Sequence, residues 1–283
     1  MRINFKGFLI TGYVILLLVN CFEVRSGITI SALQLTIGLF IFLPKLLRNN
    51  DYQNIRLSFA LILYLLTFLL GIFYNYFSLP NHFFVFFAIT LIIVLYEDLN
   101  VAKENFRWLF IVLMGFATIH KLAEPTFING DFVGFMMAKG GFFYHIINSG
   151  LFSELKQSII DNNHQISYLM KSDPVESRAV ILDIPSISFN LVVNIFSYLI
   201  IIGELVLTLL FVFLPSKKYT LFFLWVFINS IVFITVELEF ISTLLFIGLI
   251  LCPNDFKLLN KSYGLSFLFY AFLSIAFNGY HLF

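Results

Sequence analysis

The chain has 283 residues, of which 60% are hydrophobic and only 12% are charged, whereas soluble domains carry about 25% charged residues. This composition excludes an ordinary soluble enzyme and predicts an integral membrane protein, as does the mean hydropathy of +0.95. The net charge of +1 and the lack of a basic cluster exclude a nucleic-acid-binding protein.

Apolar segments recur along the chain at close to the length of about 20 residues that a membrane-spanning helix needs. The first has a basic start, like a signal peptide, but it lacks a small-residue cleavage site, so we interpret it as a retained anchor. The seventh and eighth segments could alternatively form one bent helix. The sequence therefore predicts an all-α bundle of eight to nine spanning helices in a single domain, 1–283. The segments are 5–22, 27–47, 55–77, 82–97, 106–122, 190–214, 219–236, 238–252 and 263–281.

Basic residues predict the orientation of this bundle, because cytoplasmic loops carry an excess of Lys and Arg. With the N-terminus in the cytoplasm, all the strongly basic connections fall inside, and the short outer connections hold one basic residue, Arg25. We therefore expect a multi-pass protein of the plasma or inner membrane whose C-terminus lies outside. The basic connections are 45–56, 103–107, 217–218 and 257–261.

One connection is much longer than the others and covers residues 123–190 on the outer side. Its stretches 132–137 and 141–145 are apolar enough to lie in the membrane interface or to re-enter the bundle. Residues 153–163 mix charged and apolar side chains as a surface helix does. Loops of this length are usually functional, so we expect an extracytoplasmic or re-entrant loop that takes part in the function.

Two ionisable residues, His120 and Lys121, close the fifth segment. A lysine there can simply extend its ammonium group to the interface. The predicted topology, however, brings the start of the fourth segment, with Asn81 as a helix cap and His82 after it, to the same outer face. A lysine beside a histidine in a dry pocket loses its proton more easily and can act as a base. Lys121 and His82 are therefore candidate catalytic residues.

Other polar residues inside apolar segments are candidates for supporting positions. Glu204 lies within the sixth segment, where a carboxylate must be neutral or paired. Asn229 in the seventh segment can bridge helices. Glu124 and Asp131 are interpreted as solvated loop residues. No hydrolase, phosphate-loop or metal-ligand motif occurs, so no metal is predicted.

Three stretches carry a family resemblance. The first is 110–122, which ends in His120-Lys121-Leu122, with Phe127-Ile128-Asn129-Gly130 after it, and the second is 80–84. The third runs from Ile202-Gly203-Glu204-Leu205 through 227–230 to Cys252-Pro253. Together they resemble the HTTM family, the transmembrane domain of vitamin K-dependent gamma-carboxylases and their bacterial relatives.

The resemblance implies a function. Lys121 would be the base that takes a proton from reduced vitamin K or menaquinol, and His82 would assist carboxylation, with Asn81, His120, Glu204 and Asn229 in support. The reaction would be quinol epoxidation or carboxylation at the outer face. Phe127 stands where the family typically has Trp. We see no large soluble domain after the last segment, so small bacterial members, which resemble a membrane subunit in the maturation of a secreted toxin peptide, are the nearer comparison.

Two further interpretations remain open. The chain can be a non-enzymatic membrane subunit for maturation, export or binding of a secreted peptide through the 123–190 loop. More weakly, its Gly…Lys-Leu ending is similar to that of DoxX- or MauE-like redox membrane proteins. Thiol chemistry is disfavoured, because Cys21 and Cys252 form no C-x-x-C motif. The predicted partners are the lipid bilayer and a secreted peptide or protein, with no nucleic acid.

Overall fold

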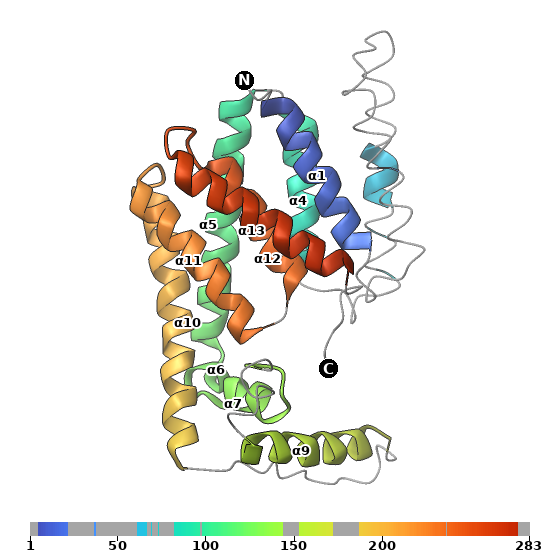
Figure 1. Cartoon of the computed structure of the whole chain (residues 1–283), viewed down its shortest axis with the longest axis vertical. Helices are drawn as coiled ribbons and strands as arrows, with labels where there is room; N and C mark the ends of the chain where they lie inside the picture. Colours follow the sequence, from blue (N-terminus) through green and yellow to red (C-terminus); the bar gives the residue numbers. More distant parts are fainter. Residues whose placement is uncertain are drawn as a thin grey trace. The chain divides into compact units, whose positions relative to one another are not determined.

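The computed structural model describes most of the chain outside its second and third predicted segments. All regular elements in this part are α-helices (Figure 1). The predicted all-α class is therefore confirmed for these residues, whereas segments 27–47 and 55–77 lie almost entirely outside them. The described residues are 5–21, 37, 61–66, 69, 73, 82–96, 98–143, 153–171, 187–235 and 237–276.

The other seven predicted segments each correspond to one helix. Four helices begin earlier than their apolar segments, α5 and α13 by a turn or more, because backbone hydrogen bonding continues into polar residues that hydropathy does not count. Proline marks two of the ends: α10 stops two residues before Pro215 and α12 stops two residues before Pro253. The helices are α1 (Phe5–Cys21), α4 (His82–Leu95), α5 (Leu99–Ala123), α10 (Ile187–Phe213), α11 (Lys218–Ile234), α12 (Leu238–Leu251) and α13 (Lys257–Ala276).

Two of the described helices are long and apolar enough to cross a membrane, judged by length and composition. They are α5, with 25 residues, and the part of α10 from Leu191 to Phe213, with 23 residues. Four shorter apolar helices lie at Leu9–Val19, Phe84–Ile93, Lys218–Ile234 and Leu238–Leu251. The structure therefore agrees with a membrane protein at this coarse level.

The described helices form two compact units. The first contains α1, α4, α12, α13, the part of α5 up to Ile111 and the part of α11 up to Trp225. Its centre is α12, which is buried on every side and packs against α1 and α13. Gly248 of α12 lies directly against the ring of Tyr263, whose hydroxyl donates a hydrogen bond to the carbonyl of Leu221 over 2.7 Å.

The second unit contains the rest of α5 and α11, the whole of α10 and the helices of the long connection. The short helices α6 (Pro125–Ile128) and α7 (Asp131–Ala138) both pack on α10. Gly130 joins them with φ +78°, and a side chain there would meet Val193 at 2.8 Å. An apolar cluster, here called the cap cluster, fills the space between them. Its buried members are Phe127, Val133, Met137, Phe142, Val193 and Ile201.

A third helix of the connection, α9 (Ser153–Lys171), packs against α7. The side-chain amides of Asn162 and Asn163 donate hydrogen bonds to the carbonyls of Ala138 and Lys139, each over 3.0 Å. These carbonyls end α7 and have no partner within the helix. The surface helix predicted at 153–163 is therefore present and continues to Lys171.

Replacing Gly248 with alanine tests the packing of α12 on α13. The new methyl group would collide with the Tyr263 ring, which the bond to Leu221 holds in place. We expect the substitution to lower the free energy of unfolding by about 1–3 kcal/mol, as overpacking does. The matched control is Gly264→Ala, because nothing lies within 4 Å of that position. Thermal unfolding in detergent should leave the control equal to wild type or up to about 1 kcal/mol more stable. Equal stability of both variants would contradict the packing.

Candidate functional site

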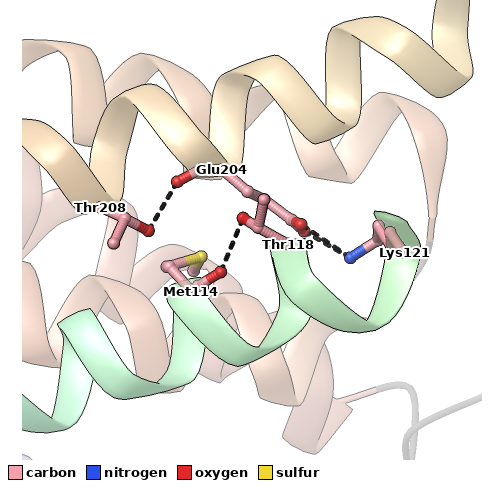
Figure 2. A network of polar contacts seen from close by, with 5 residues as sticks. All are labelled: Met114, Thr118, Lys121, Glu204 and Thr208. Carbon is pink, nitrogen blue, oxygen red and sulfur yellow. Dashed lines mark hydrogen bonds and ion pairs between the residues drawn. The ribbon is translucent and has the colours of Figure 1, made fainter. Parts of the chain in front are cut away.

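The candidate site lies where side chains of α5 and α10 meet in the second unit. Gly115 carries no side chain, and a methyl group there would lie 3.6 Å from Thr208 Cγ2, so the two helices can approach. The two helices run antiparallel here. Along α5 the chain passes from Gly115 to Lys121, whereas along α10 it passes from Glu204, the partner of Lys121, to Thr208, the neighbour of Gly115. Helical side chains lean toward the N-terminus of their own helix, so Lys121 reaches back to Glu204. Figure 2 shows the two side chains pointing toward one another.

Lys121 and Glu204 form a tight ion pair. The Lys121 ammonium donates to both carboxylate oxygens, with Nζ–Oε1 at 2.7 Å and Nζ–Oε2 at 2.8 Å. The Lys121 side chain is 19% exposed and that of Glu204 is 11% exposed. Two opposite charges so little exposed stabilise each other only if both remain in place, because a single buried charge has a large desolvation cost.

Two threonine hydroxyls lie beside the pair but do not bond to the ammonium or the carboxylate group (Figure 2). Thr118 donates to the carbonyl of Met114 over 2.9 Å, and Thr208 donates to the backbone carbonyl of Glu204 over 2.8 Å. Each hydroxyl is thus used by its own helix. The side-chain hydrogen bonds of the two charged groups in the described structure are therefore to each other.

The pair is bordered on one side by the short helices α6 and α7, which are together called the cap, and the bordering side chains are aromatic. The Lys121 Nζ lies 5.4 Å from the centre of the Phe127 ring, within the range of a cation–π interaction. Phe127 is buried in the cap cluster and stacks on Phe132, with ring centroids 5.5 Å apart. One side of the ammonium therefore faces an apolar surface, which strengthens its interaction with the carboxylate.

A serine on the same face of α10 has no hydrogen-bond partner among the described residues. Ser197 is fully buried, and its Oγ makes no hydrogen bond. It lies seven residues, almost two complete turns, before Glu204, between Val193 and Ile201 of the cap cluster. Leaving a buried hydroxyl unpaired costs about 1–3 kcal/mol. Sequence reasoning missed it because a single serine hardly lowers hydropathy, although the seven-residue spacing from Glu204 was visible.

None of the other predicted site residues is seen in contact with the Lys121–Glu204 pair in the described structure. His120 is exposed on the last turn of α5, and Asn229 is half-buried in α11. Asn81 and the side chain of His82 lie outside the described residues, so the predicted pairing of His82 with Lys121 stays a prediction. Glu124 and Asp131 are exposed, as expected of solvated residues, although they stand at the starts of α6 and α7.

The site holds no evident metal-binding group. In the part of the chain that the structure describes, no three His, Cys, Asp or Glu side chains are grouped so that they could hold a metal ion. Cys252, at the end of α12, is a free and buried thiol. At the pair itself, an amine and a carboxylate are already in hydrogen-bond contact and can exchange a proton.

Comparisons with protein-family models, characterised proteins and solved structures find no match to this chain. The resemblance to the HTTM family therefore rests on the sequence motifs alone.

Replacing the members of the pair separately and together measures their coupling. We expect Lys121→Met or Glu204→Leu to lower the free energy of unfolding by about 2 kcal/mol, somewhat less than for a fully buried pair. The double variant should regain at least about 1 kcal/mol of the summed loss, because it leaves no unpaired charge. Denaturation in detergent measures all three.

The control for this cycle is a pair on α5 whose carboxylate is far more exposed: Arg107 contacts Glu104 at 2.7 Å, and the Glu104 side chain is 50% exposed. Glu104→Ala should change stability by less than about 1 kcal/mol, as is usual for surface ion pairs. If the Lys121 and Glu204 variants were as harmless as this control, the pair would not be the constraint described here.

The hydroxyl of Ser197 has no partner among the described residues, so removing it should not lower the free energy of unfolding, unlike the substitutions in the ion pair. Ser197→Ala removes a buried polar atom that bonds to nothing described, so stability should stay equal or rise by about 1 kcal/mol. The matched control is Ser242→Ala in α12, since Ser242 is also fully buried but donates to the carbonyl of Leu238 over 2.7 Å. Melting temperatures of the two variants should move apart, and a clear loss of stability in Ser197→Ala would show that the hydroxyl is bonded.

Proposed function

We propose that this chain is a multi-pass membrane protein of the HTTM type that oxidises a reduced quinone, with Lys121 as the base. The observation that carries the proposal is the contact of the Lys121 ammonium with both oxygens of Glu204 beside an apolar cap. In this proposal eight or nine helices span the membrane, the N-terminus is cytoplasmic, and the long connection 123–190 lies on the extracytoplasmic side of the pair.

Glu204 supplies what a lysine base needs at neutral pH. Lys121 can accept a proton only after it has lost one, and a carboxylate 2.7 Å away is the acceptor within reach. Transfer of one proton converts the ion pair into a neutral amine and a carboxylic acid, which an apolar environment favours relative to water. The neutral amine then takes the proton of a quinol hydroxyl, and the ammonium forms again beside a quinolate anion. Glu204 is in this proposal the positioning and proton-accepting partner of the base.

Phe127, which lies beside Lys121, and the rest of the cap cluster suit a quinol in chemical character. Phe127, Met137 and Ile201 of the cap cluster offer aromatic and aliphatic contacts, and Ser197 offers a buried hydroxyl with no partner in the described structure. Once bound and deprotonated, the quinol itself would react with oxygen, and that reaction would yield an epoxide and a strong base. The residues of this chain contribute removal of the first proton, an apolar surface that excludes water, and a hydrogen-bonding group for orientation.

A binding subunit for a secreted peptide or protein is the second candidate. It is favoured by the construction of the long connection, whose helices α6, α7 and α9 are held on α10 and on one another by the cap cluster and two asparagine amides. The outer helix α9 also exposes the side chains of Ile160 and Tyr168, which a peptide could contact. In this case the ion pair would be structural.

A quinol oxidation assay distinguishes the two candidates. The protein in nanodiscs is mixed with reduced vitamin K or menaquinol under air, and epoxide is followed by mass spectrometry. We expect product from wild type and a decrease of about 100-fold or more in Lys121→Ala, the usual effect of losing a catalytic base. Glu204→Gln, which cannot take up the lysine proton, should also lose activity.

The control variant is Lys139→Met. Lys139 resembles Lys121 in lying 5.2 Å from an aromatic ring, that of Phe135, but no carboxylate contact with it is seen in the described structure. It should keep wild-type activity. Absence of epoxide from wild-type protein that is folded would overturn the enzymatic proposal, and cross-linking through Tyr168 of α9 would then test the binding subunit.

A further inference from the structure

We infer that α6 and α7 form a re-entrant segment within the outer half of the bilayer, where Phe132 and Phe135 contact lipid acyl chains. The Lys121–Glu204 pair then lies near the bilayer centre. This inference rests on the membrane location in the proposed function, but it does not depend on the reaction.

The depth of the pair follows from the position of Glu204 in α10. At about 1.5 Å per residue, the 23 apolar residues from Leu191 to Phe213 extend about 35 Å, slightly more than the roughly 30 Å hydrocarbon core of a bilayer. Glu204 is about 20 Å from the first of these residues and about 14 Å from the last. The ion pair is therefore close to the midpoint of the α10 span, deeper than the outer-face position that the sequence suggested for Lys121. In this inference α5, which ends at Ala123, crosses only the inner half of the bilayer before the chain enters α6.

The cap contacts α10 within this same apolar stretch. Gly130, between α6 and α7, lies against Val193 and Asn194, and the cap cluster includes Ile201. Each of these α10 residues falls between Leu191 and Glu204, which is the outer half of the span in the predicted orientation. If α10 crosses the membrane along this stretch, the helices packed on it are at membrane depth as well.

Apart from Asp131, the first residue of α7, the exposed side chains of α7 and of this part of α10 are apolar. On α10 they include Leu191, Ile195 and Leu199, and on α7 they are Phe132 and Phe135, which is 44% exposed. Between Asp131 and Lys139 the sequence of α7 has no ionisable residue. Exposed apolar side chains of this kind suit acyl chains rather than water.

The backbone of the cap also meets the requirement that lipid imposes. Non-helical backbone at membrane depth is tolerated only where the protein satisfies its hydrogen bonds. The N–H groups at the turns donate within the protein: Gly130 to Phe127 O at 3.2 Å, Gly140 to Met137 O at 2.9 Å and Gly141 to Met136 O at 2.6 Å. The N–H of Phe143 donates over 2.9 Å to the carbonyl of Ile234, at the end of α11. The carbonyls of Ala138 and Lys139 accept from α9, as described above.

Quenching of tryptophan fluorescence by brominated lipids tests the depth of the cap. The two native tryptophans, Trp108 and Trp225, are replaced by phenylalanine, and the full chain is placed in phosphatidylcholine vesicles brominated on the acyl chains. In this background Phe135→Trp reports on the cap, Leu199→Trp on the exposed face of α10 (58% exposed) and Gln165→Trp on the exposed face of α9. Phe132→Trp serves as a second reporter if Phe135→Trp does not fold.

We expect bromolipid to quench Phe135→Trp at least half as strongly as Leu199→Trp, while aqueous iodide quenches mainly Gln165→Trp. The inference is overturned if the cap reporters respond to iodide like Gln165→Trp while Leu199→Trp is still quenched by lipid. If bromolipid fails to quench Leu199→Trp too, α10 does not span the membrane, and the location in the proposed function fails with it. Loss of quinol oxidation alone would leave the depth result unchanged.

Discussion

The Lys121–Glu204 ion pair is the interaction on which the rest of the second unit depends. Two charges that are little exposed to water must stay within hydrogen-bond distance, so α5 and α10 are held in one register. The helices lie close together beside the pair, since a methyl group at Gly115 would be in van der Waals contact with Thr208, 3.6 Å from its Cγ2. The apolar contacts of Phe127 then border the pair, and they also connect it to the cap.

The same arrangement joins stability and chemistry. A lysine and a carboxylate in contact are stable as an ion pair, yet an apolar border lowers the cost of their neutral form. In the proposed function Lys121 can act as a base only after Glu204 has taken its proton. The buried hydroxyl of Ser197, beside the cap cluster and without a partner among the described residues, is an unfavourable feature that a purely structural core would not retain without cost. The cap and the pair are therefore best considered as one site in the proposed function.

Most helices could be predicted from the sequence because a spanning helix needs a long apolar run, and such a run is visible without any tertiary information. The ends were less certain. The helix around Phe106 begins at Leu99 and the last begins at Lys257, since polar residues continue a helix that hydropathy does not register. The helix at 153–163 was recognised from its mixed pattern, although its last turns were not.

Composition and basic residues were enough to indicate an all-α protein compatible with a membrane and to single out Lys121 and Glu204, because a charge in an apolar run is conspicuous in any context. Their pairing was decided only by tertiary structure. Glu204 lies 83 residues after Lys121, and its requirement for a partner does not specify which partner. Ser197 and the contact of Gly115 with Thr208 were equally invisible, because burial and close approach arise only when helices distant in the sequence pack together.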